Sequence, residues 1–216
     1  MARVSKDATV SLVRLGAAGL IAASLAVQAH DDLTRGTFTW GQLPSYFTPL
    51  ANIAGIVALL AAAVVGSREP RWVALLRVNA ATYLVMVAVV YWALLAPYAR
   101  PLNPWANAVI HGGAAVLLTL DWLIARPRHR LPWSSVWTVL SLPGAWLVYL
   151  AVRAHIDGWM PYPFLDTSRG IALPVASVAA MVIVGLTVTA LLHLCAQARV
   201  RVAARHSRLD GLRLAS

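Results

Sequence analysis

Charged residues are scarce in this chain. Asp, Glu, Lys and Arg make up 12% of its 216 residues, whereas 60% of the residues are hydrophobic. A soluble domain carries about a quarter of charged residues, so this composition excludes an ordinary soluble protein and indicates an integral membrane protein. The single cysteine, Cys195, excludes an internal disulfide and a multi-cysteine metal site.

The few charges are unbalanced, with 18 basic and 8 acidic side chains and a net charge of +10. In a soluble protein this excess would suggest nucleic-acid binding. Here the basic residues stand in short segments between apolar runs. We therefore expect contact with membrane lipids and no nucleic-acid partner.

Six apolar runs follow one another along the chain, each near the length of about 20 residues that crosses a bilayer as a helix. They lie at 10–28, 48–65, 72–96, 105–125, 133–154 and 171–197. No repeat or long linker separates them. The sequence predicts an all-α membrane protein that forms a single domain over 1–216, a bundle of six transmembrane helices.

The first run has an alternative interpretation. Arg3, Lys6 and Arg14 precede a short apolar core, and Val27-Gln28-Ala29 resembles a signal-peptidase site. Cleavage there would leave five spans. We expect the first span to be retained.

Positive charge gathers at alternate boundaries of the runs. It occurs at the N-terminus, at Arg68 and Arg71, at residues 126–130 and in the tail 199–216. By the positive-inside rule both termini are then cytoplasmic. The basic tail is predicted to form a surface helix that is attracted to anionic lipid head groups.

The fourth run carries an ionisable residue, His111, near its predicted external end. Asn107 lies four residues earlier, on the same helix face. An ionisable residue inside a membrane span suggests function, and a neutral imidazole serves as a general base near physiological pH. The alternative is a buried histidine that hydrogen-bonds a neighbouring helix.

Thr48 is the hydroxyl best placed to pair with His111, since it opens the second run at the same predicted side. A threonine becomes a nucleophile when a base takes its proton. Pro49 follows directly, however, and Thr before Pro is typical of an N-cap with proline at the first helical position. Both roles stay open.

Two further sets of polar residues have structural explanations. Asp121, at the inner end of the fourth run, is predicted to pair with Arg77 of the third. His155, Asp157 and Asp166, with His30, Asp31 and Asp32, could together supply metal ligands, but their spacing matches no metal motif. We expect neither a metal nor a cofactor.

Three segments together resemble a known family. Trp105–His111 (W-A-N-A-V-I-H), Tyr162–Asp166 (Y-P-F-L-D, with His155 at a matching distance before it) and Tyr46–Asn52 (Y-F-T-P-L-A-N) resemble segments of the androgen-induced gene one and androgen-dependent TFPI-regulating proteins. The chain looks closer still to bacterial six-span integral membrane proteins, which often carry a D-W-L like Asp121–Leu123.

The resemblance implies a membrane hydrolase of fatty acyl esters that needs a threonine, at Thr48, and a histidine, at His111. Asn52, Asn107, His155 and Tyr162 are then candidates to support the reaction, as oxyanion donors or as orienting groups. The expected location is a cell membrane, the inner membrane of a bacterium. Two alternatives remain: a small proton-coupled transporter using His111 and Asp121, and a non-catalytic structural or assembly protein.

Overall fold

A computed structural model describes residues 2–41, 43–125 and 131–213. The predicted basic loop at 126–130 lies outside the described residues, as do the side chains of the basic tail from residue 198 onward. Six helices are long and apolar enough to cross a membrane, which confirms the predicted six spans and identifies a multi-pass membrane protein. They cover Asp7–Thr34, Phe47–Arg68, Arg71–Tyr98, Pro104–Ile124, Trp133–Asp157 and Ala172–Gln197.

Four of these spans change helix type along their length. The third consists of α3 (Arg71–Val90), a π-helix η3 (Tyr91–Leu95) and a 3₁₀ turn η4 (Ala96–Tyr98). The fourth consists of α4 (Pro104–Ala108), a π-helix η5 (Val109–Gly113) and α5 (Ala114–Ile124). The fifth begins as a 3₁₀-helix, η6 (Trp133–Leu140), and continues as α6 (Ser141–Asp157).

The second span consists of α2 (Phe47–Val65) and a 3₁₀ turn η2 (Gly66–Arg68), whereas the first and sixth are single α-helices, α1 (Ala2–Thr34) and α7 (Ala172–Arg213). Proline and glycine set several helix boundaries. Pro104 opens α4, where its missing N–H costs no intrahelical bond. Gly158 ends α6 in the left-handed region at φ +69°, and its N–H bonds the Ala154 carbonyl.

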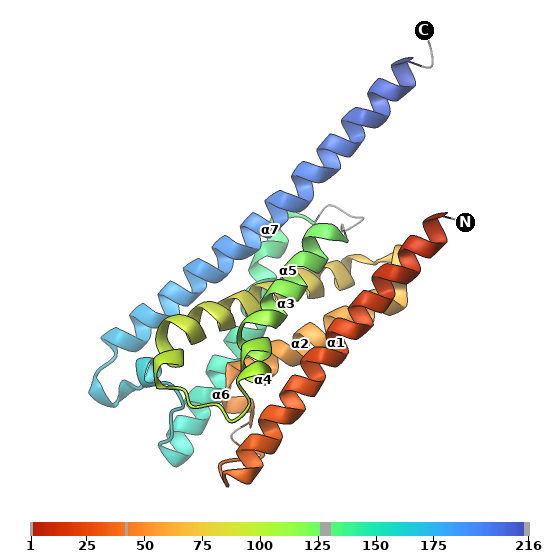
Figure 1. The fold of residues 1–216 in the computed structure, drawn as a ribbon. Helices are drawn as coiled ribbons and strands as arrows, with labels where there is room; N and C mark the ends of the chain where they lie inside the picture. The colour runs from red at the N-terminus through yellow and green to blue at the C-terminus, as the bar shows by residue number, and fades with distance from the viewer. Residues whose placement is uncertain (1, 42, 126–130, 214–216) are drawn as a thin grey trace.

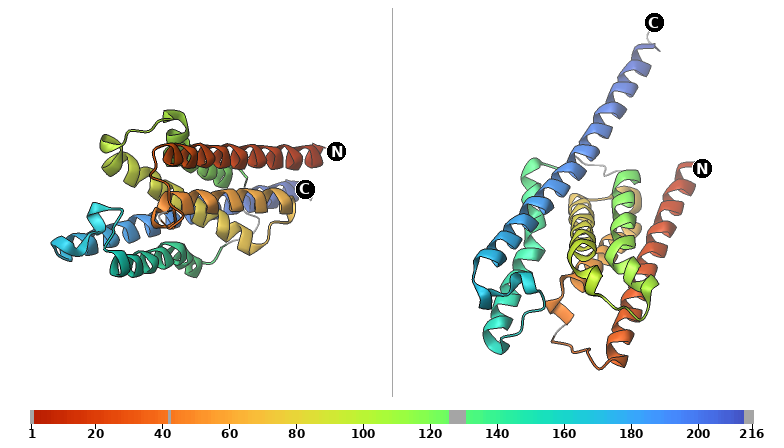
Figure 2. Two further views of the ribbon diagram at one scale, coloured as in Figure 1. Left: turned by 90° about the horizontal axis from the view of Figure 1, so that it is seen from below. Right: turned by 60° about the vertical axis from the view of Figure 1, so that its left-hand side comes forward.

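The helix α3 is central to the bundle, because it contacts α2, α5 and α7. Figure 1 and the right-hand view of Figure 2 show α6 and α7 on one side of it and α1 on the other. The chain reverses direction at each connection, so both termini lie at the same end of the bundle (Figure 1). The assignment of that end to the cytoplasm remains a prediction.

Two groups of buried apolar side chains hold the spans together. The larger group joins α1, α2, α3 and α5 and reaches Leu192 of α7. The smaller group consists of Trp146 and Leu150 of α6 with Tyr162 and Leu165 of the following loop. Because this second group includes loop residues, the 158–171 segment is fixed against the bundle.

A cluster of four buried charges lies at the end of the bundle that carries the termini. Asp121 of α5 accepts from Arg14 of α1 at 2.7 Å and from Arg77 of α3 at 2.6 Å. Arg77 also bonds Glu69 at 2.7 Å. Two guanidinium groups thus neutralise two carboxylates, so a set of ions that would be very costly in hydrocarbon carries no net charge.

Backbone carbonyls complete this ion cluster. Arg14 donates to the Ala62 oxygen of α2 at 2.9 Å, and Arg77 donates to the Asp121 and Ala125 oxygens, each at 2.9 Å. The structure brings together the predicted pair of Arg77 and Asp121. The sequence interpretation did not include Arg14 in this cluster, because it grouped Arg14 with the basic residues that precede the apolar core of the first run. Its guanidinium is buried and donates to the Asp121 carboxylate and to the Ala62 oxygen.

We expect Asp121→Asn to lower the free energy of unfolding by about 3 kcal/mol, because the change leaves the buried Arg14 guanidinium without a counter-charge and leaves Arg77 with Glu69 alone. Thermal unfolding of the detergent-solubilised protein measures this loss. Asp157→Asn is the control, since it breaks an exposed ion pair with Arg153. Equal melting of the Asp121 variant and the wild type would contradict a stabilising role for the ion cluster.

Candidate active site at the end opposite the termini

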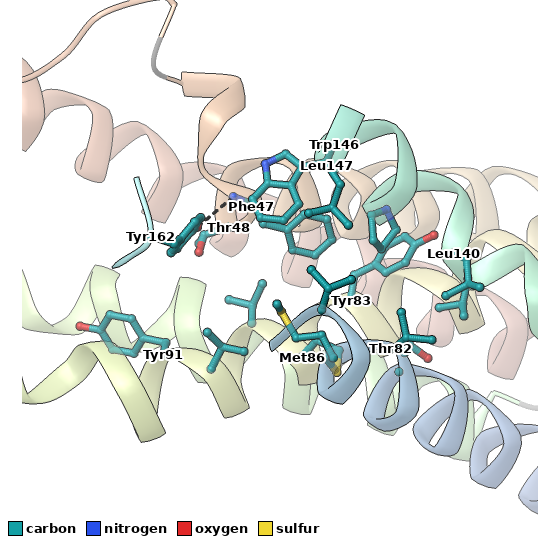
Figure 3. Close-up of a pocket in the computed structure, with 18 of the residues that line it drawn as sticks. Phe47, Thr48, Thr82, Tyr83, Met86, Tyr91, Leu140, Trp146, Leu147 and Tyr162 are labelled. Carbon is teal, nitrogen blue, oxygen red and sulfur yellow. Dashed lines mark hydrogen bonds between the residues drawn. The ribbon is translucent and has the colours of Figure 1, made fainter. Parts of the chain in front are cut away.

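Thr48 lies in the first turn of α2. The N-cap of this helix is Tyr46, which makes no side-chain capping bond. The first helical N–H, that of Phe47, instead donates to the Tyr162 hydroxyl oxygen at 3.1 Å (Figure 3). The prediction that Thr48 caps the helix is therefore wrong: Tyr162 satisfies the helix terminus from outside, and the helix starts before Thr48.

Tyr162 is almost fully buried beside this helix start, with 6% of its surface exposed. Burial raises the pKa of its hydroxyl to about 12, and the bond from the Phe47 N–H offsets only part of that effect. The hydroxyl therefore keeps its proton across the physiological range. Its oxygen accepts from Phe47, so its hydrogen remains for a further acceptor.

His111 lies in the π-helix η5. Its Nδ1 is 3.0 Å from the carbonyl oxygen of Asn107, one turn earlier. A carbonyl oxygen only accepts, so Nδ1 must carry the proton in this bond. In the neutral ring Nε2 then holds the free lone pair, which is the arrangement that a general base requires.

An aromatic contact fixes the plane of this imidazole. The His111 ring stacks on Tyr91 of η3, with ring centroids 3.6 Å apart and planes inclined by 16°. The Tyr91 hydroxyl in turn lies 2.7 Å from Nδ2 of Asn107. The two residues that stack both belong to π-helices, which are rare and occur frequently at functional sites.

Side chains from two other spans bond to the carbonyls of η5. Trp92 Nε1 donates to the His111 oxygen at 3.0 Å. A Cβ at Gly112 would lie 3.3 Å from that indole nitrogen, so a glycine after His111 permits the approach. Asn52, which is fully buried, donates through Nδ2 to the Ile110 oxygen at 3.0 Å.

Asn52 also ties this segment to the candidate nucleophile, since its Nδ2 bonds the Thr48 carbonyl oxygen at 2.9 Å. One amide group therefore joins the backbone of Thr48 to that of Ile110, next to His111. Its Oδ1 is buried and has no partner among the described residues. Asn52 positions the two segments, and its N–H groups are already used.

A cavity of about 310 Å³, called here the polar cavity, adjoins both candidate residues. Thr48 and His111 line it, together with charged side chains at its outer rim, Asp32, Arg35 and Arg100. Within the described part of the chain, the Thr48 hydroxyl and the His111 ring are not hydrogen-bonded to each other. Both residues border the same space.

Several predicted site residues lie elsewhere. His155 is exposed at the end of α6 and does not line the polar cavity. Asp121 and Arg77 belong to the ion cluster at the opposite end. In residues 2–41, 43–125 and 131–213 no three His, Cys, Asp or Glu side chains are grouped as metal ligands. Asp31 instead accepts from Asn103, and Asp157 from Arg153.

The sequence interpretation did not identify Tyr91 as a partner of His111. Its only local signal is the pair Tyr91-Trp92 within an otherwise aliphatic run. The stack with His111 depends on π-helical turns in two spans, which periodicity does not reveal.

Comparison with protein-family models, with curated proteins and with solved structures found no match for this chain.

The hydrogen bonds predict one tautomer of His111, with the proton on Nδ1. In a ¹⁵N-histidine-labelled sample in lipid, the His111 ring should show a protonated Nδ1 and an unprotonated Nε2 at neutral pH. A His111→Asn sample assigns the signals by their loss. Protonation on Nε2 alone would contradict the bond to Asn107 and would remove the lone pair from the proposed base.

Proposed function

We propose that this protein is a membrane-embedded hydrolase of fatty acyl esters, with Thr48 as nucleophile and His111 as general base. The proposed location is a cell membrane, the inner membrane of a bacterium. The observation that carries the proposal is the shared polar cavity, which both residues line. The similarity of the segments around Thr48, His111 and Tyr162 to a family of such hydrolases supports it.

In the first step the Thr48 oxygen attacks the acyl carbonyl carbon while His111 Nε2 takes the hydroxyl proton. Catalytic hydrogen bonds often form only in the substrate complex, so the missing direct bond between the two side chains is compatible with this role. Collapse of the tetrahedral intermediate breaks the ester bond. His111 returns the proton to the leaving alcohol oxygen, and the acyl group remains on Thr48.

In the second step water attacks the acyl-threonine, and His111 takes a proton from that water. The Thr48 oxygen then leaves and recovers a proton from the imidazolium. The products are a carboxylic acid and an alcohol, and the enzyme is restored.

The oxyanion needs donors close to Thr48. Asn52 and Asn107 were candidates from the sequence, but both N–H groups of Asn52 already bond backbone carbonyls, and Asn107 Nδ2 donates to the Tyr91 hydroxyl. Tyr162 is better suited, because its hydroxyl hydrogen has no acceptor in the described part of the chain and its oxygen bonds the start of α2. The positive end of the α2 dipole adds to the stabilisation of negative charge there.

A packing role for His111 is the second candidate, and the stack on Tyr91 favours it. Such a histidine would hold the third and fourth spans together and perform no chemistry. A proton-coupled transporter receives less support, because both carboxylate oxygens of Asp121 are engaged by guanidinium groups.

We expect Thr48→Ala to lower kcat for hydrolysis of a long-chain acyl ester by about 10³-fold or more, because the nucleophile is lost. The same change should abolish labelling by a fluorophosphonate probe, which reacts with activated hydroxyl groups. Thr187→Ala is the matched control. Thr187 is an exposed threonine of α7 that bonds only its own helix, at the Ile183 oxygen.

Fluorophosphonate labelling that survives in Thr48→Ala would refute the assignment of the nucleophile. A His111→Ala variant that melts at a lower temperature but hydrolyses esters at the wild-type rate would establish the packing role instead.

A further inference from the structure

A second cavity, called here the apolar pocket, lies among three spans. Its volume is about 100 Å³, and nearly all of its lining is hydrocarbon. Figure 3 shows Met86 and Tyr83 on one side and Leu147 and Trp146 on another. Each span contributes one helical face: the third span from Thr82 to Tyr91, the fifth span from Val139 to Leu147, and α7 from Val178 to Gly185. Phe47 and Thr48 at the start of α2 also line the pocket.

Thr82 lines the apolar pocket at one end and pairs there with a threonine of α7. Thr82 of α3 and Thr189 of α7 are fully buried, and their hydroxyl oxygens lie 3.0 Å apart. Each also bonds a carbonyl of its own helix, Val78 and Gly185 respectively. Because each hydroxyl hydrogen has an acceptor, either the carbonyl of its own helix or the other threonine, this end has no need of a polar ligand.

Gly185 lines the pocket near the same end. A Cβ built at Gly185 meets no heavy atom within 4 Å, although the residue is buried. The missing side chain therefore leaves open space inside the protein. The face of the third span from Thr82 to Tyr91 extends for about 13 Å at the α-helical rise, a depth suited to part of a fatty acyl chain.

The other end of the pocket reaches the candidate active site. Thr48 and Tyr91 line both the apolar pocket and the polar cavity. Figure 3 shows Thr48 beside Tyr162 at this end, with Thr82 at the far end. A ligand that fills both spaces must therefore have a hydrocarbon part and a polar part, joined next to the Thr48 hydroxyl.

We propose that the apolar pocket binds the acyl chain of a bilayer-derived amphiphile, and that Gly185 sets the length of chain accepted. The polar cavity then receives the other part of the molecule. The chemistry of the bound ester rests on the proposed function, whereas the binding of the chain does not. The occupant is a single extended hydrocarbon chain, because the three helix faces surround one narrow space.

The test is a series of p-nitrophenyl esters from butanoyl to palmitoyl, assayed with the detergent-solubilised protein. Each methylene buried contributes about fourfold to kcat/KM, so the wild-type value should rise with chain length until the pocket is full. Gly185→Leu should lower kcat/KM for the dodecanoyl ester by about tenfold or more, since its side chain occupies the inner end. The butanoyl ester should change by less than about twofold, because a short chain does not reach that far.

Gly144→Leu is the matched control, since Gly144 is an exposed glycine of α6 outside the pocket lining and its Cβ also meets no atom within 4 Å. It should keep the wild-type length profile. Met181→Trp fills the pocket from another turn of α7 and should act like Gly185→Leu, so the test does not depend on one variant. Unchanged length profiles in both pocket variants would overturn the inference.

A binding measurement separates this inference from the proposed function. A fatty acid with a photoreactive diazirine near its methyl end should label α3 or α7 in the wild type and in Thr48→Ala, and should label Gly185→Leu at least fivefold less. Labelling of this kind without any ester hydrolysis would support the pocket and reject the hydrolase. If hydrolysis requires Thr48 but the labelling is as strong in Gly185→Leu as in the wild type, the hydrolase is supported and the inference about the pocket is rejected.

Discussion

The architecture depends on Asp121, whose carboxylate forms ion pairs with Arg14 of the first span and Arg77 of the third. An isolated charge inside a membrane span is costly, so these groups are stable there only together. Their carbonyl partners extend the network to α2 and α5. Four of the six spans are thereby fixed in register at one end, and α6 and α7 pack against this unit largely through apolar side chains.

With one end fixed, the opposite ends of the third and fourth spans can depart from regular α-helix. Two π-helices place Tyr91 against His111. Backbone groups within a membrane protein need partners, and here Trp92, Asn52 and His111 itself satisfy carbonyls around η5. The same side chains that meet this requirement hold the imidazole beside the polar cavity, which Thr48 borders from α2.

The sequence predicted those features of the fold that follow from the length of the apolar runs and from the polar residues within them. Six spans are visible in the apolar runs, and Arg77 with Asp121 were paired because isolated charges there would be too costly. The sequence placed the start of α2 within one residue but not its cap, because the Tyr162 hydroxyl that accepts from the Phe47 N–H lies 115 positions away. Likewise, the burial of Arg14 could not be predicted, because this residue lies close to the other basic residues of the N-terminus. The apolar pocket depends on the absence of a side chain at Gly185, which only packing reveals.

The central claim is that Thr48 carries the acyl group during turnover. Brief incubation of the purified protein with p-nitrophenyl dodecanoate, followed by acid quench and peptide mass spectrometry, tests this most directly. The account predicts a dodecanoyl group on the peptide that contains Thr48, released by hydroxylamine. Ester turnover with the acyl group on a different side chain, or with no acyl-protein at any time point, would contradict it.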